Sequence, residues 1–95
     1  MADEGQPHRS VHDLPEPSFS TLLISLSTQA LMHLGEIPDL ASGAQEKDLP
    51  AAKSIIDILA VLERKTAGNL DAGESSLLER ILYDLRMRFV EVARS

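Results

Sequence analysis

The sequence predicts an all-α protein of three helices preceded by a disordered N-terminal tail. Apolar residues recur at three- and four-residue spacing in three segments, and no strand-like alternation lasts long enough to compete. Helix-ending glycines and a proline separate the segments, at Gly35, Pro38 and Gly68. A chain of 95 residues suits one domain. We place a single helical domain at residues 18–95 and the tail at residues 1–17.

The predicted tail carries three prolines, four acidic residues and scattered apolar ones. Such a segment cannot bury enough apolar surface to offset the entropy that ordering costs. His8 and His12 stand four residues apart, a spacing that can hold a metal on a helix. Without a rigid scaffold around them, these histidines are better interpreted as a chance pairing in solvent.

The first helix is expected to begin after Ser18, a good N-cap, and to stop at Gly35. Residues 18–34 contain no Lys, Arg, Asp or Glu, in a chain of which 25% is charged. A surface helix normally keeps a charged face toward water, so we expect this one to be covered on more than one side. Its main apolar stripe comprises Phe19, Leu22, Leu23, Leu26, Ala30 and Leu34, while Ile24 and Leu31 lie on another side.

The second helix is expected to start after Asp48, which can cap it, and to end at Gly68. A capping-box spacing at Asp71 and Glu74 then starts a third helix, from about residue 72 to about residue 93. The brief connection between these two helices forces an antiparallel hairpin, on which the first helix must pack. The broad face of the second helix comprises Ala51, Ala52, Ile55, Ile56, Ile58, Leu59 and Leu62, and the main face of the third comprises Leu78, Ile81, Leu82, Leu85, Phe89 and Val92.

The third helix carries a second apolar stripe on nearly the opposite side, formed by Tyr83, Met87 and Val90. A lone three-helix unit cannot cover this stripe, and oligomerisation is a common remedy for so small a core. We therefore predict a homo-oligomer, most simply a dimer. An unidentified protein partner is the alternative cover for the stripe. The expected interface residues are Ile24, Leu31, Tyr83, Met87 and Val90.

Composition excludes several functional classes. Nine basic against fifteen acidic residues give a net charge of −6, which disfavours a nucleic-acid partner. The absence of cysteine rules out disulfides, thiolate catalysis and Cys-based zinc sites. The uncharged stretch at residues 18–34 is too short and too rich in Ser and Thr to span a bilayer, so we expect no membrane partner and a cytoplasmic location.

Small polar clusters allow both a functional and a structural interpretation. His33 lies near Glu36 and Asp39, which could be metal ligands or an ordinary helix end. Arg80, Asp84 and Arg88 could bind an anion or form a ladder of surface ion pairs, and Asp57 could pair with Lys53 or across helices. The structural interpretation is favoured in each case. We therefore assign no catalytic, cofactor-binding or metal-binding residue and expect no cofactor.

These features favour a non-enzymatic, self-associating helical protein that acts by interaction, or as an adaptor, in the cytoplasm. The alternative is a small enzyme or metal-dependent factor whose site forms at a subunit interface. Such a site would draw His33, Asp57, Asp84 and Arg88 from neighbouring chains.

Four segments resemble a small bacterial family known only as a domain of unknown function, number 1844. They are FSTLLISLSTQALMHLG at 19–35, LPAAKSIIDIL at 49–59, ERKTAGNL at 63–70 and LYDLRMRFVE at 82–91. The resemblance covers nearly everything from Phe19 to Glu91. It implies a short, all-helical bacterial protein and brings no reaction, cofactor or substrate.

Deleting residues 1–17 should leave the fold intact, because the tail has too little apolar surface to pack on a core. Thermal melts followed by circular dichroism should give nearly the same midpoint for the full and the shortened chain. A fall of many degrees would show instead that the tail packs on the domain.

Overall fold

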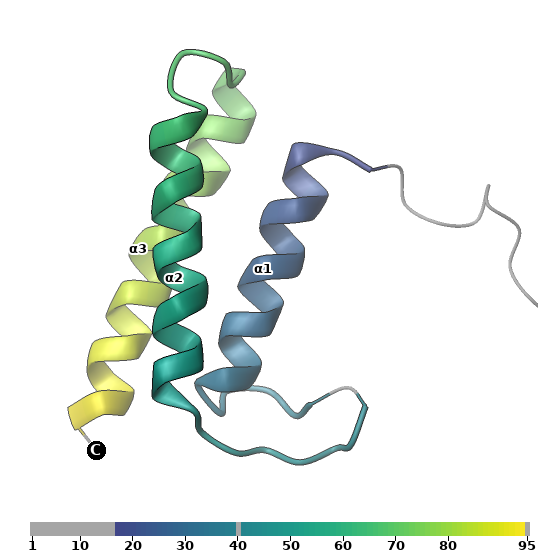
Figure 1. Cartoon of the computed structure of the whole chain (residues 1–95), viewed down its shortest axis with the longest axis vertical. Coiled ribbons are helices and arrows are strands. Elements are labelled where there is room, and N and C mark those ends of the chain that lie inside the picture. The colour runs from purple at the N-terminus through teal and green to yellow at the C-terminus, as the bar shows by residue number, and fades with distance from the viewer. Residues whose placement is uncertain (1–16, 40, 95) are drawn as a thin grey trace, which may run out of the picture.

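The computed structural model of the chain describes residues 17–39 and 41–94. Three α-helices follow one another along the chain, α1 (Phe19–His33), α2 (Leu49–Lys65) and α3 (Ala72–Arg94). The helices α2 and α3 form an antiparallel hairpin, and α1 packs against both of them (Figure 1). The all-α fold class and the helix arrangement predicted from the sequence are confirmed. The loop end of the hairpin extends beyond the N-terminus of the shorter α1.

Polar side chains start the three helices where the sequence predicts. The Ser18 hydroxyl accepts a hydrogen bond from the Thr21 backbone N–H at 3.1 Å, and the Asp48 carboxylate accepts one from Ala51 at 3.1 Å. At α3, Asp71 accepts from the Glu74 backbone N–H at 2.7 Å while Glu74 accepts from the Asp71 N–H at 3.0 Å. These bonds satisfy N–H groups that have no partner inside their own helix.

A tight turn joins α1 to the loop that leads into α2. Gly35 has a φ of +78°, a left-handed conformation that other residues adopt at a cost, so α1 ends where the sequence predicts. The same loop returns to this point, because the Asp48 backbone N–H donates to the His33 carbonyl at 2.7 Å. The end of α1 and the beginning of α2 are therefore tied together by backbone atoms.

All three helices contribute leucine, isoleucine or alanine side chains to one core. Leu23, Leu59 and Leu85, one from each helix, are wholly buried. No polar or charged side chain is buried among the described residues, so packing of apolar side chains holds the helices together. Within residues 17–39 and 41–94, the buried residues are Leu23, Ala30, Leu34, Ala52, Ile56, Leu59, Leu78, Leu82 and Leu85.

Two residues assigned to core faces from the sequence lie at the surface instead. Leu22 on α1 and Ile58 on α2 are each 43% exposed. A helix that contacts two neighbours buries a limited arc, and these residues fall just outside it. The periodic pattern marks the direction of the core well and its lateral limits poorly.

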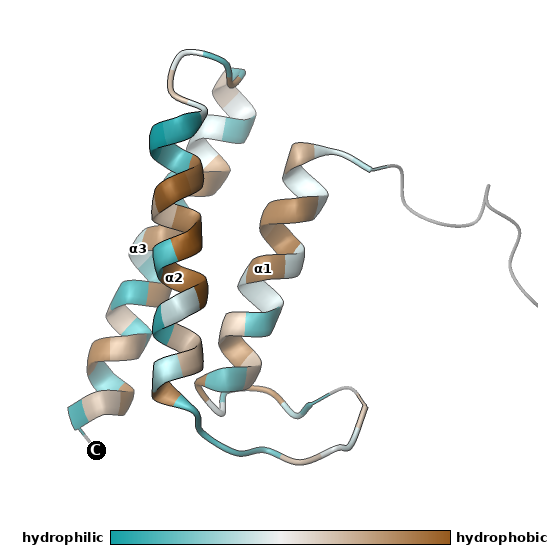
Figure 2. Ribbon diagram, in the orientation of Figure 1, coloured by the Kyte–Doolittle hydropathy of each residue, from teal (hydrophilic) through white to brown (hydrophobic). Residues whose placement is uncertain are grey.

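The described residues also leave the outer side of α1 uncovered. Ile24, Ser25 and Gln29 are exposed on it, so within this part of the chain α1 packs on the hairpin side alone. Figure 2 shows hardly any strongly hydrophilic residue along α1 before its C-terminal half. The tail predicted at 1–17 lies outside the described residues, except for Pro17.

Replacing Leu85 by Ala should lower the free energy of unfolding by about 2–5 kcal/mol, because a wholly buried side chain leaves a cavity. The matched change Leu22→Ala should cost clearly less, because 43% of this leucine is already exposed to water. Urea unfolding of both variants measures the difference. Equal losses would contradict the placement of the core.

Candidate interaction surface

The second stripe of α3 lies at the molecular surface. Tyr83 is 69% exposed, and Met87 and Val90 are each 49% exposed. Successive spacings of four and three residues place these side chains along one side of the helix. Large apolar side chains that are contiguous and hydrated mark a surface suited to protein contact.

Two adjoining hollows run between α2 and α3 beside this stripe. The first, of about 370 Å³, is lined by Glu63, Glu79, Leu82, Tyr83, Arg86, Met87 and Val90. The second, of about 210 Å³, is lined by Lys53, Ile56, Asp57, Arg86, Phe89 and Val90. Arg86 and Val90 line both, so the hollows form one surface, which we call the α2–α3 groove. All these lining residues come from α2 and α3, which places the groove on the side of the hairpin that α1 does not cover.

Charged residues are unevenly distributed along the α2–α3 groove. Two carboxylates, Glu63 and Glu79, lie toward the loop of the hairpin. At the other end, Lys53 and Asp57 pair with each other at 2.8 Å, the surface pair predicted from their spacing. Arg86 lies between the two ends. The groove therefore has an apolar middle and an acidic end. At its other end, the charges of Lys53 and Asp57 neutralise each other.

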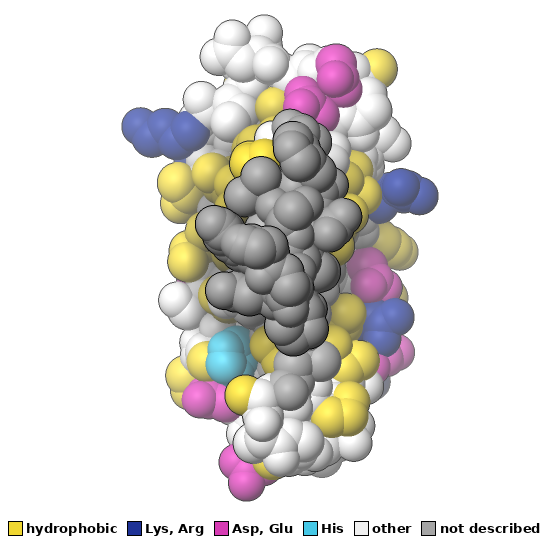
Figure 3. All heavy atoms as spheres, turned by 90° about the vertical axis from the view of Figure 1, so that its right-hand side faces the viewer, with side chains coloured by type: hydrophobic (Ala, Val, Ile, Leu, Met, Phe, Trp, Pro, Cys, Tyr) yellow, Lys and Arg dark blue, Asp and Glu magenta, His cyan; other side chains and the backbone are white. Residues whose placement is uncertain are grey.

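The structure separates the five residues predicted to form one interface. Tyr83, Met87 and Val90 all line the α2–α3 groove, whereas Ile24 and Leu31 belong to α1 and do not. Ile24 is 54% exposed, and Leu31 is half-buried against the core. Seen from the α1 side, hydrophobic side chains flank both edges of the molecule (Figure 3).

Arg88 joins α3 to the segment that follows α1. Its side chain donates to the Asp84 carboxylate at 2.8 Å and to the Glu36 carboxylate at 2.8 Å. The hydrogen bond and charge of Asp84, with a smaller contribution from Glu36, raise the pKa of the Arg88 guanidinium above its ordinary value. All three side chains are at least one-third exposed, so they form a surface network that orients the turn after α1. Arg80, the third member of the predicted ladder, makes no ion pair with another described residue.

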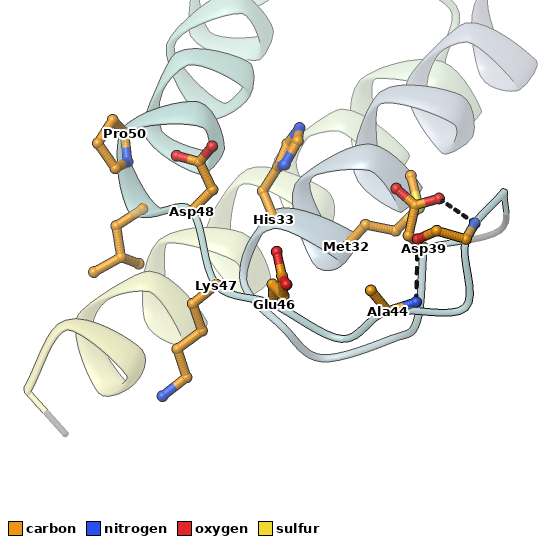
Figure 4. A pocket seen from close by; sticks show the side chains of 10 residues that line it. Met32, His33, Asp39, Ala44, Glu46, Lys47, Asp48 and Pro50 are labelled. Carbon is orange, nitrogen blue, oxygen red and sulfur yellow. Dashed lines mark hydrogen bonds between the residues drawn. The ribbon is translucent and has the colours of Figure 1, made fainter.

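A larger polar hollow, of about 590 Å³, lies between the end of α1 and the start of α2. His33, Asp39, Glu46 and Asp48 line it (Figure 4). Asp39 accepts from the backbone N–H groups of Ala41 and Ser42 at 2.7 and 3.1 Å, and Asp48 caps α2. These carboxylates therefore hold the loop in shape. Across residues 17–39 and 41–94, no group of three or more acidic or histidine side chains is arranged to hold a metal ion.

The predicted metal-ligand candidates do not come together in the structure. The Glu36 carboxylate accepts a hydrogen bond from Arg88, and the Asp39 carboxylate accepts one from the Ala41 backbone N–H in its own loop. His33 is half-buried beside α2. Asp57, Asp84 and Arg88 are all engaged in ion pairs at the surface. His8 and His12 lie outside the described residues.

The α2–α3 groove was not predicted from the sequence, although its α3 side was. In the sequence, Glu63, Glu79 and Arg86 have the pattern of ordinary solvent-facing charges, and only the folded hairpin brings them to the same groove. One feature of the sequence did indicate that Glu63 lies near apolar residues. Glu63 falls four residues after Leu59 and seven after Ile56, on the apolar face of α2.

The fold and this groove define a small helical-bundle protein with an apolar surface on its hairpin. A family model for a domain of unknown function, DUF1844, matches residues 16–91. The chain therefore belongs to this family. Comparisons with curated proteins and with solved structures gave no match. None of the described helices has the length and apolar character needed to cross a membrane.

We expect the chain without residues 1–17 to bind neither Zn²⁺ nor Ni²⁺ tightly, because its acidic side chains are held by backbone N–H groups and ion pairs. Titration calorimetry on this shortened chain is the measurement. One metal per chain at sub-micromolar affinity, lost in His33→Ala, would contradict the structural interpretation of the polar hollow. It would favour the metal-dependent alternative.

Proposed function

We propose that this protein is a non-enzymatic interaction module that self-associates through the α2–α3 groove. The observation that carries the proposal is the exposure of Tyr83, Met87 and Val90 beside a groove with an apolar floor. Burying such side chains against a second protein surface removes apolar area from water. A second copy is the partner to which we commit, since a two-fold interface is the commonest way to complete a small homo-oligomer.

The polar clusters support an interaction role over a chemical one. Arg88, Asp84 and Glu36 bind one another, and Asp39 and Asp48 bind backbone groups. Each of these side chains thus has a structural task at the surface. The stripe of Tyr83, Met87 and Val90 is apolar and exposed, and an exposed apolar surface of this kind serves recognition.

The proposal places the protein in the bacterial cytoplasm, as the family resemblance implies. A chain without cysteine and with a net charge of −6 suits a reducing compartment with protein partners better than a nucleic-acid surface. In an adaptor, the exposed uncharged side of α1 would remain available for a second protein while the groove is occupied.

Val90→Glu should dissociate the oligomer. Val90 is half-exposed in the single chain, so the fold should tolerate the change, whereas a carboxylate enclosed between two subunits costs about 3–5 kcal/mol. Sedimentation velocity over a concentration series gives the association constant. Circular dichroism verifies that the variant stays folded.

The matched control is Ser25→Glu, which adds the same charge to the exposed, uncharged side of α1. It should leave association unchanged. Dissociation by Ser25→Glu alone would place the interface on α1, and a wild-type chain that sediments as a monomer at about 50 µM would refute self-association altogether.

A further inference from the structure

We infer that two copies of the chain pair through α3 in antiparallel orientation, with a two-fold axis passing between Arg86 and Met87. This inference rests on the proposed self-association and specifies its geometry. In this arrangement each α3 lies along the α2–α3 groove of the other subunit, and the two hairpins form a four-helix bundle.

The groove calls for a helix with a narrow apolar stripe, and α3 itself carries one. Tyr83, Met87 and Val90 have the alternating four- and three-residue spacing with which helices pack side by side. They line the groove from one edge and stand exposed above it. A two-fold interface uses the same surface on both subunits. The stripe of each subunit therefore lines its own groove and enters the groove of the partner.

Apolar matching selects the register. Antiparallel helices place opposite each other residues that are equally far, in sequence, from the axis. An axis between Arg86 and Met87 sets Tyr83 opposite Val90 of the partner subunit, and Met87 opposite the aliphatic stem of Arg86. Moving the axis onto Met87 would set Tyr83 against Glu91 and Val90 against Asp84, which places charged groups on apolar side chains.

Charge complementarity selects the same register. Glu79 then lies opposite Arg94 of the partner subunit, twice by symmetry. Neither residue makes an ion pair with any other described residue, and both are exposed. Glu63 lines the groove next to Glu79, so the arriving guanidinium meets a pair of carboxylates at the acidic end. Opposite charges at the ends of a two-fold helix pair also oppose the parallel orientation.

The absence of cysteine from the chain allows a direct test by disulfide trapping. One chain carries Tyr83→Cys and an affinity tag, and the other carries Val90→Cys without a tag. The two are mixed, allowed to exchange subunits and oxidised mildly, and the products are separated by size. A disulfide needs Cα atoms within about 7 Å, whereas two copies of residue 83 lie about 10 Å apart along the axis in this register.

The mixed disulfide should exceed each homodimer disulfide about tenfold. A dominant Tyr83→Cys homodimer would overturn the register while leaving self-association through α3 in place. Pairing through α3 would be overturned if the chain sediments as a dimer but neither Tyr83→Cys nor Val90→Cys forms a disulfide, while Ser25→Cys does. A wild-type monomer would refute the proposed function as well.

Charge reversal gives a second readout that needs no cysteine. Glu79→Arg should weaken dimerisation about tenfold, since it places two like-charged pairs at the interface. Adding Arg94→Glu in the same chain should restore the wild-type constant to within about threefold. Arg80→Glu, on the same helix and away from the groove, is the control and should change little. Failure of the double variant to recover would contradict the Glu79–Arg94 pairing.

Discussion

A hairpin of two amphipathic helices has two sides, and the described chain supplies one further helix to cover them. Helix α1 covers one side and completes a core that contains Leu23, Leu59 and Leu85. The other side keeps a groove lined by Tyr83, Met87 and Val90. Because no described helix covers this second side, the core is small and an apolar surface stays exposed to water. The ion pairs lie at the surface.

The two exposed apolar regions differ in chemical character. The outer side of α1 combines Ile24 with Ser25 and Gln29 and carries no charge. The α2–α3 groove combines a stripe of larger side chains with Glu63, Glu79 and Arg86. Charges at defined positions fix orientation and register, whereas an uncharged helix face sets neither. The groove is therefore the better candidate for a specific two-fold contact.

Charged residues near the loops serve the fold. Asp39 and Asp48 hold the long loop between α1 and α2, while Glu36 and Arg88 fasten the turn after α1 to α3. Exposed pairs of this kind contribute little stability individually, so their effect is to orient the segments they join. Membership of an uncharacterised domain family adds no reaction to this account, and the surface geometry carries the functional proposal.

The helices, their caps and the hairpin can be predicted from the sequence, because they depend on local signals. Ser18, Asp48 and the Asp71–Glu74 box act within a few residues of themselves, and Gly35 provides the positive φ that ends α1. The apolar stripe of α3 was visible for the same reason. Which of the apolar residues are covered depends on how the folded helices pack. Leu22 and Ile58 fall outside the packed arc, Leu31 falls within reach of the core, and Glu63 and Glu79 meet at one end of a groove. These outcomes depend on the angle at which each helix faces its neighbours, which helical periodicity fixes only to within a residue or so.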